Sequence, residues 1–384
     1  MQKLLVITSR IPYPLEKGDK LRIYHQLKYL SRHFKICLCA INDSKIHPKA
    51  EYELKKYCNE IHFLNIHKFQ IAGGIIKSFF NGEPLQVGYF YHSSIQSKLD
   101  KVVKSFQPDF IFCQLIRTAK YALKYPHSKT LDYMDALSKG TERRIEHASI
   151  WMKWILKTET KRLIKFESAV FNYFNNHCII STEDQKYIQH PHHKNIKIIP
   201  NGIDLDFFKP IETEKKYDIV FTGNMSYPPN VKAAQFLVQK IAPLMDKKIK
   251  ILISGAQPQK EVILLQSESC HITGWVDDIR NSYSSAKLFV APLHMGTGLQ
   301  NKILEAMAMK IPCITTSLVN ASIGAKENEE IIIANTADQF AEKIIYFLEN
   351  YHEAENIANR AFLFVSKKFN WEQSTNELIK LILN

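Results

Sequence analysis

A lysine and a glutamate three residues apart, Lys302 and Glu305, lie in the part of the sequence best suited to chemistry. Two glycines, Gly296 and Gly298, precede them, and strong helix formers follow. Glycines let a backbone approach a ligand closely, and a helix N-terminus presents free N–H groups and a positive dipole end. The pattern therefore predicts an anion site in which Lys302 contacts phosphate and Glu305, on the same helical face, contacts sugar hydroxyls.

The alternative is an ordinary surface loop with an exposed Lys302–Glu305 ion pair. The surrounding sequence favours the ligand site, because apolar runs at 288–292 and 313–316 suit buried strands on either side of the helix. Strand, loop, helix and strand form a parallel crossover. A cation and a carboxylate on one short helix suit a nucleotide sugar.

The elements that position these residues belong to a series of apolar runs with helical patterns between them, for instance at 21–31 and 95–106. Such alternation predicts parallel sheets with helices on both faces. The series restarts after loop-forming residues, and 384 residues are too many for one ordinary core. We expect two Rossmann-like α/β domains, 1–200 and 216–364, joined by a linker at 201–215. Ligands bind beyond the carboxyl ends of such strands, so a cleft is expected between the domains. The expected strands are 3–8, 34–41, 61–66, 110–114, 129–133, 178–181, 196–199, 217–222, 249–254, 271–273, 287–292, 313–316 and 331–333.

Three charged residues of the first domain are further candidates. Asp132 and Asp135 end an expected strand, where they would orient an acceptor hydroxyl or act as a base. Helix capping and loop hydrogen bonding are the alternative for each. Arg22, which follows Gly18, is a candidate phosphate contact or an exposed charge on the helix at 21–31.

The net charge of +13 calls for an anionic partner, such as phosphorylated substrates, nucleic acid or anionic lipid. The densest basic stretch, 141–166, alternates with apolar residues at helical spacing, including Trp151 and Trp154. It is expected to form one basic amphipathic helix that binds a membrane surface, or alternatively one whose apolar face, with both tryptophans, packs on the core. Its basic residues are Arg143, Arg144, Lys153, Lys157, Lys161, Arg162 and Lys165.

Composition excludes several classes. A hydrophobic content of 45% and a charged content of 23% are those of a globular protein, and no apolar run approaches the roughly 20 residues needed to cross a bilayer. The first residues suit a core strand and not a signal peptide. Seven scattered cysteines have no zinc spacing, and they suit buried thiols in a reducing, cytoplasmic compartment. No metal site is expected.

Several ordered motifs resemble the GT-B glycosyltransferases of family 4, a retaining group with nucleotide-sugar donors, and a subgroup associated with exopolysaccharides in particular. The resemblance spans nearly the whole chain. In the first domain and the linker, its motifs are Arg10 to Arg22 after the first strand and Pro200-Asn201-Gly202-Ile203-Asp204. In the second domain they are Phe221-Thr222-Gly223-Asn224 with Tyr227-Pro228-Pro229-Asn230, then Gly274-Trp275-Val276, and then Gly296 to Met309. The last motif, Phe369-Asn370-Trp371-Glu372, lies in an expected final helix, 365–384, that crosses back onto the first domain.

The resemblance implies a site and a mechanism. The donor, a UDP- or GDP-sugar, would be bound by Gly18, Arg22, Gly223, Asn224, Trp275, Val276, Gly296, Thr297, Gly298, Leu299, Gln300, Asn301, Lys302 and Glu305. Front-face attack, with the leaving diphosphate helping to take the acceptor proton, needs no enzymic nucleophile. The protein then mainly stabilises charge on the diphosphate, with neither metal nor cofactor. Lys302, Glu305, Asp132 and Asp135 are the candidate catalytic residues.

The sequence departs from the family pattern in two places. Many members carry two glutamates eight positions apart, and here Thr297 stands at the first position. The polar contacts of the missing glutamate would then be made by Gln300, Asn301 and Lys302. The Arg and Lys expected after the first strand of the second domain are replaced by Gly223-Asn224.

The expected function is transfer of a sugar to a glycan or lipid-linked acceptor in cell-surface polysaccharide or glycolipid synthesis, at the inner face of the cell membrane. Two alternatives stay open. A non-hydrolysing nucleotide-sugar epimerase shares the fold, and a non-catalytic nucleotide- or nucleic-acid-binding module would also explain the charge. Aromatic residues do not alternate with basic ones as in an RNA-binding sheet, so nucleic acid is not an expected partner.

Overall fold

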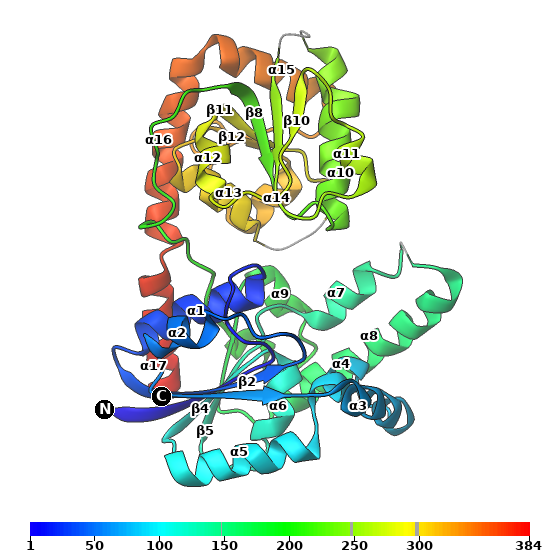
Figure 1. The fold of residues 1–384 in the computed structure, drawn as a ribbon, viewed down its shortest axis with the longest axis vertical. Helices are drawn as coiled ribbons and strands as arrows, with labels where there is room; N and C mark the ends of the chain where they lie inside the picture. The colour runs from blue at the N-terminus through cyan, green and yellow to red at the C-terminus, as the bar shows by residue number, and fades with distance from the viewer. Residues whose placement is uncertain (147, 246–248, 296–298) are drawn as a thin grey trace. The chain divides into compact units, whose positions relative to one another are not determined.

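The computed structural model describes residues 1–146, 148–245, 249–295 and 299–384. It divides into two compact units, one of residues Met1–Asn201 with Trp371–Asn384, the other of Gly202–Asn370. Each unit contains one parallel sheet with helices (Figure 1). The α/β fold with two Rossmann-like units is the predicted one.

The first sheet has the strand order β3-β2-β1-β4-β5-β6-β7, all parallel. Its central strands are continuous apolar runs because both faces are covered. The strands are β1 (Gln2–Thr8), β2 (Phe34–Asn42), β3 (Glu60–Asn65), β4 (Phe110–Gln114), β5 (Ser128–Asp132), β6 (Asn176–Ile179) and β7 (Lys197–Ile198).

Two apolar layers cover the faces of this sheet. Helices α1, α2 and α17 pack on one face, and α5 and α6 pack on the other. Helix α1 begins at Gly18, earlier than expected, and buries Ile23, Leu27 and Leu30 at helical spacing. The helices are α1 (Gly18–Leu30), α2 (Ala50–Lys55), α3 (Lys68–Asn81), α4 (Leu85–Phe90), α5 (Ser93–Phe106), α6 (Ile116–Ala122), α7 (Leu137–Arg143), α8 (Ile150–Phe171), α9 (Thr182–Tyr187) and α17 (Trp371–Leu383).

The second sheet has the order β10-β9-β8-β11-β12-β13 and is also parallel. Its strands are β8 (Tyr217–Thr222), β9 (Ile251–Ser254), β10 (Cys270–Ile272), β11 (Ala286–Ala291), β12 (Cys313–Thr315) and β13 (Ile332–Ile333). Its α-helices are α10 (Pro228–Phe236), α11 (Lys260–Ile263), α12 (Ile279–Ser284), α13 (Asn301–Ala308), α14 (Ser317–Ile323), α15 (Ala337–Glu349) and α16 (Tyr351–Lys368).

The C-terminal residues expected as one helix form two. Helix α16 ends at Lys368 in the second unit, and α17 begins at Trp371 in the first. Leu378, Ile379 and Ile382 of α17 join the core that covers β1 and β2. The last helix therefore belongs to the first unit.

The single basic helix predicted over 141–166 is wrong in its first part. Helix α7 ends at Arg143 and α8 begins at Ile150. Buried Glu167 on α8 accepts hydrogen bonds from the backbone N–H of Ser138 (2.9 Å) and from its hydroxyl. These bonds hold the start of α7 against the second half of α8, which one continuous helix does not permit.

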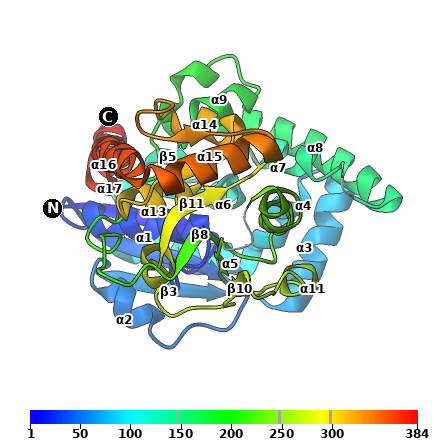
Figure 2. The ribbon, with the colours of Figure 1, turned by 90° about the horizontal axis from the view of Figure 1, so that it is seen from above.

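The alternative in which both tryptophans pack on the core is also wrong. Trp151 and Trp154 are 86% and 62% exposed, whereas Leu156 and Leu163 further along α8 are buried. The first turns of α8 project from the rest of the unit (Figures 1 and 2). No helix within the described ranges is long and apolar enough to cross a bilayer.

Candidate active site

The order of the second sheet changes direction between β8 and β11, because β9 lies on one side and β12 on the other. Open α/β sheets bind ligands at such a switch point, beyond the carboxyl ends of the strands. Gly223 follows β8 there with φ +155°, and Gly255 follows β9 with φ +143°. A Cβ on Gly255 would lie 1.8 Å from the carbonyl oxygen of Gly223. The two loops are therefore in direct backbone contact, which only glycine permits.

Lys302 lies over Gly223, in the first turn of α13. A Cβ on Gly223 would be 3.2 Å from Lys302 Nζ and 2.7 Å from Asn230 Nδ2. The ammonium donates a hydrogen bond to Asn230 Oδ1 and lies 5.3 Å from the centroid of the Phe221 ring. Asn230 in turn donates to the carbonyl of Asn224 (2.8 Å). Lys302 lies in the first turn of a helix, as expected, and the glycine beside it is Gly223.

Burial makes the Lys302 cation costly. Desolvation lowers the pKa of Lys302 to about 8, although the carboxylate of Glu305 opposes the shift. Within the described ranges, no carboxylate lies within ion-pair distance of the ammonium. An anionic ligand would supply the missing counter-charge.

Glu305 lies on the same helix and is held by a tyrosine. The fully buried hydroxyl of Tyr283 donates to Glu305 Oε2 (2.8 Å) and shares a 2.8 Å hydrogen bond with the Thr222 hydroxyl. Desolvation raises the pKa of Glu305, while Tyr283 and Lys302 oppose the rise. The expected alternative, a direct surface ion pair between Lys302 and Glu305, is not formed in this structure, because each side chain has its own neutral partner.

The N-terminus of α13 has no side-chain cap. Gln300 precedes the helix, and its carbonyl accepts from the backbone of Ile303 (3.0 Å) while its side chain does not cap the helix. The buried Oδ1 of Asn301 has no partner among the described residues. Leu299 packs on the core of the unit. The predicted donor contacts Gly296, Thr297 and Gly298 lie outside the described residues.

The remaining second-unit candidates are Asn224, which follows β8, and Trp275 and Val276, which follow β10. Asn224 is exposed, and its side chain accepts hydrogen bonds from the backbone and hydroxyl of Ser226. Trp275 is 64% exposed and follows Gly274, whose φ is +68° and whose carbonyl accepts a 3.0 Å hydrogen bond from Gly255. Val276 is partly buried. Trp275 therefore offers an uncovered aromatic face on a loop that is joined to the Gly223–Gly255 contact.

Two candidates of the first unit bond to each other. Arg22 Nε donates to Asp132 Oδ2 (2.6 Å), and both side chains are fully buried. Arg22 Nη1 also donates to Asn201 Oδ1 (2.8 Å), and Asp132 Oδ1 accepts from the backbone of Met134. Neither side chain has a surface that a substrate reaches, so the geometry corrects the expected roles. The pair joins α1 to β5 and to the end of the first unit.

Asp135 and Gly18 are both exposed. Desolvation by the surrounding protein, and then repulsion from Asp184, raise the pKa of Asp135 to about 6. A carboxylate with that pKa suits the predicted role of base. Gly18 starts α1, and a Cβ there would make only an ordinary 3.6 Å contact with Met134.

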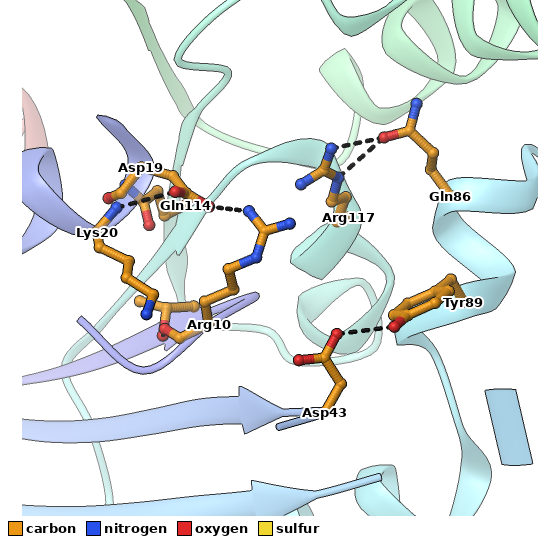
Figure 3. A network of polar contacts seen from close by, with 9 residues as sticks. Arg10, Asp19, Lys20, Asp43, Gln86, Tyr89, Gln114 and Arg117 are labelled. Carbon is orange, nitrogen blue, oxygen red and sulfur yellow. Dashed lines mark hydrogen bonds and ion pairs between the residues drawn. The ribbon is translucent and has the colours of Figure 1, made fainter. Parts of the chain in front are cut away.

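Several polar residues at the carboxyl ends of β1, β2 and β4 have no separate role in the sequence motifs. Figure 3 shows Arg10 beside Asp19, Arg117 beside Gln86, and Asp43 beside Tyr89. Tyr283 and Asn230, which hold Glu305 and Lys302, were also missed as site residues. Asn230 lies at the start of α10 and Tyr283 near the end of α12, and the partner of each is far away along the chain.

One group of possible metal ligands occurs in the described part of the chain. The ligand atoms of Cys37, Glu60 and His62 lie within 4.8 Å of one another on β2 and the edge strand β3. Cys37 pairs with Glu60 in the first half of β2, away from the carboxyl ends of the strands. The group is therefore separate from the residues described above. All seven cysteines are free and buried.

Two curated bacterial proteins are similar to this chain. A 44.6 kDa protein of the cps region of Klebsiella pneumoniae is 23% identical, and the alignment covers 99% of this chain and all of that protein. The capsular polysaccharide biosynthesis glycosyltransferase CapM of Staphylococcus aureus is 26% identical over 45% of this chain and 51% of its own length.

Solved structures of the same fold align over nearly the whole chain. HepE of Anabaena, solved with UDP and glucose, superposes with a TM-score of 0.73 at 12% identity over 99% of each chain. Sucrose-phosphate synthase of Thermosynechococcus elongatus gives 0.70 at 14% identity, over 99% of this chain and 98% of that one. Residues 216–350 match the family model described as "Glycosyl transferases group 1". The chain is therefore similar to the group 1 glycosyltransferases in sequence over residues 216–350, and it has the GT-B fold of two Rossmann-like units.

Proposed function

We propose that this enzyme transfers a sugar, with retention of anomeric configuration, from a nucleoside diphosphate sugar to a glycan or lipid-linked acceptor of a cell-surface polysaccharide or glycolipid. The observation that carries the proposal is the position of Lys302. Its ammonium lies over Gly223, beside the uncapped start of α13 and at the switch point of the second sheet. A diphosphate there would meet a cation and free helix N–H groups together.

The chemistry of these residues is electrostatic. As the bond between sugar and diphosphate breaks, negative charge grows on the diphosphate, and preorganised donors stabilise it. Lys302 is preorganised because Asn230 holds its ammonium. Glu305, held by Tyr283, would bind the ribose hydroxyls of the nucleotide. No nucleophile is needed for a front-face transfer, and neither metal nor cofactor is required by these groups.

The relatives support both substrates. HepE was solved with UDP and with UDP-glucose, which favours a UDP-sugar over a GDP-sugar as donor. TarM was solved with UDP and α-GlcNAc-glycerol. The cps-region protein and CapM favour a polysaccharide or its lipid-linked precursor as acceptor.

We further propose that the enzyme works in the cytoplasm, at the inner face of the cell membrane. Ile150, Trp151 and Trp154 are exposed on the first turns of α8, and Lys157 and Lys161 are exposed further along the helix. Helix α3 adds exposed Phe69 and Phe80. Aromatic and basic side chains together bind the interface of an anionic bilayer.

A panel of nucleotide sugars, incubated with and without candidate acceptors, tests the catalytic proposal. We expect release of nucleoside diphosphate to depend on an acceptor, and the product linkage to keep the donor's anomeric configuration by NMR. Interconversion of donor sugars without an acceptor would instead indicate an epimerase. Inversion in the product would contradict the retaining mechanism.

A further inference from the structure

The first sheet has its own switch point, between β1 and β4, because β2 lies on one side and β5 on the other. An arginine follows each of these two strands. Arg10 comes two residues after β1, and Arg117 three residues after β4. Figure 3 shows their guanidinium groups turned toward one another, with Tyr89 and Asp43 beside the same space. Parallel sheets bind ligands at this position.

Arg117 is held by neutral partners and an aromatic ring. Its Nε and Nη2 donate to the amide oxygen of Gln86 (3.1 and 2.6 Å), and its guanidinium lies 5.5 Å from the Phe90 ring centroid. No carboxylate is within ion-pair distance of it among the residues described. Desolvation and then repulsion by Arg10 lower the pKa of Arg117, while the carboxylates of Asp19 and Asp135, which form no ion pair with it, oppose the shift. Holding a half-buried guanidinium this way is unfavourable until an anion arrives.

Arg10 adds a second cation to the same space. It pairs with Asp19, whose backbone carbonyl accepts a 2.8 Å hydrogen bond from Gln114, so the pair is fixed at the end of β4. Its other side borders a hollow of about 150 Å³ lined also by Lys17 and Lys20. Burial lowers the pKa of the Lys20 ammonium. Glu16 and Asp19 oppose this shift, and Lys17 and Arg10 add to it. Positive charge is therefore concentrated around the switch point, where low-dielectric walls strengthen its field.

We propose that Arg10 and Arg117 bind an oxyanion carried by the acceptor, either a phosphate or a sugar carboxylate. A guanidinium fork matches both groups, because each presents paired oxygens to two N–H donors. Asp43 accepts a 2.8 Å hydrogen bond from Tyr89 through Oδ2, which leaves Oδ1 to accept from a neighbouring sugar hydroxyl. The inference rests on the proposed function, and it assigns the donor diphosphate to Lys302 in the other unit.

Calorimetric titration of the full-length protein tests the assignment, with UDP in excess to occupy the second-unit site. Glycerol 3-phosphate represents a phosphate-bearing acceptor, glucuronate a carboxylate-bearing one, and glucose a neutral one. We expect one of the two anions to bind more tightly than glucose. Arg117→Gln and Arg10→Gln should each weaken that binding at least tenfold, and Arg117→Lys should weaken it less.

Arg32→Gln is the matched control, because Arg32 pairs with Glu372 on the surface of the same unit with both side chains about half exposed. It should leave anion binding unchanged. An anion affinity that Arg117→Gln does not alter would overturn the proposal, as would equal binding of all three probes. A matching loss of UDP affinity in Arg117→Gln would also overturn it, because the arginine would then hold the donor.

Failure of the proposed function looks different. In that case no nucleotide sugar supports transfer, while arginine-dependent anion binding persists. If instead the present inference is wrong, sugar transfer remains and does not depend on Arg117.

Discussion

The Lys302 ammonium donates a hydrogen bond to Asn230, so α13 and α10 are tied together above Gly223. The two helices follow β11 and β8, the strands on either side of the switch point. Asn230 is neutral, so it orients the cation without cancelling its charge. The charge therefore remains available to a ligand, at the cost of a lowered pKa.

Nucleoside diphosphate affinity should fall as pH rises above about 8. Lys302 in the free protein has a pKa of about 8, because burial disfavours the ammonium, whereas a bound diphosphate stabilises it. The ligand therefore binds the protonated form, and deprotonation above this pH opposes binding. The terminal phosphate is already ionised at these pH values.

Lys302→Arg is the variant that tests this cause, since a guanidinium stays charged throughout the range. Its UDP affinity, measured by calorimetry between pH 7 and about 9.5, should be flat. The same fall in Lys302→Arg as in the wild type would assign the pH dependence to another group.

Glu305→Ala and Lys302→Ala should each weaken UDP binding by roughly 1.5–3 kcal/mol, because each removes a charged hydrogen-bond partner. Tyr283→Phe should weaken it less, since it only frees the Glu305 carboxylate to move. Tyr346→Phe is the matched control: its hydroxyl donates to exposed Glu353 (3.0 Å) in the same unit. Unchanged affinity in Glu305→Ala would remove Glu305 from the donor site.

The strands and the place of Lys302 were predictable because both depend on local pattern. Apolar runs indicate buried parallel strands, and glycine before a helix indicates an anion site. The fate of Arg22 was not predictable, because its partners Asp132 and Asn201 are 110 and 179 residues away. From the sequence alone, a charged residue at helical spacing is expected to be exposed. The fold can bury it by bringing a carboxylate to it.

The break between α7 and α8 was missed for a related reason. Helical spacing continues through the basic stretch, and only the distant bonds of Glu167 to Ser138 require the chain to fold back. Arg117 carries no motif at all. Its place at the switch point follows from the order of the strands, which composition and periodicity do not determine.

Removing either partner of the Arg22–Asp132 pair should cost about 3–5 kcal/mol in the free energy of unfolding, because the other charge stays buried without compensation. Arg22→Met and Asp132→Asn, unfolded with urea, would measure this. The double variant should lose less than the sum of the two. Arg32→Met, which breaks an exposed pair, should cost no more than about 1 kcal/mol. Equal losses at Arg22 and Arg32 would contradict a structural role for the buried pair.

Transfer should continue in EDTA, because Lys302 and the start of α13 serve the diphosphate without a metal. Turnover with and without EDTA, magnesium and manganese gives the measurement. The Cys37–Glu60–His62 group requires a control, since a metal there would act on stability. If EDTA lowers activity in the wild type but not in His62→Gln, the metal that EDTA removes is bound on β3 and not in the donor site. Loss in both, restored by magnesium or manganese, would contradict metal-independent transfer.

Binding to vesicles should require anionic lipid and should weaken with salt. Each basic residue near an anionic surface contributes about 1 kcal/mol, and the attraction is screened over roughly 8 Å at physiological ionic strength. Sedimentation with phosphatidylcholine vesicles, with and without phosphatidylserine, measures the partition. Reversal of Lys153, Lys157 and Lys161 to Glu should remove most binding, because these side chains flank the exposed Trp151 and Trp154 of α8.

The first unit offers a matched control for this charge reversal on another helix. Lys98, Lys101 and Lys104 are exposed at similarly close spacing on α5, which has no exposed tryptophan. Reversing these three changes the net charge by the same amount, so a general effect of charge would lower binding equally in both triple variants. A surface on α8 predicts a large loss in the α8 variant and a small one in the α5 variant. Trp151→Ala with Trp154→Ala should weaken binding even at high salt, where the apolar contribution remains. Equal partition of the wild type onto neutral and anionic vesicles would rule out an electrostatic membrane site on α8.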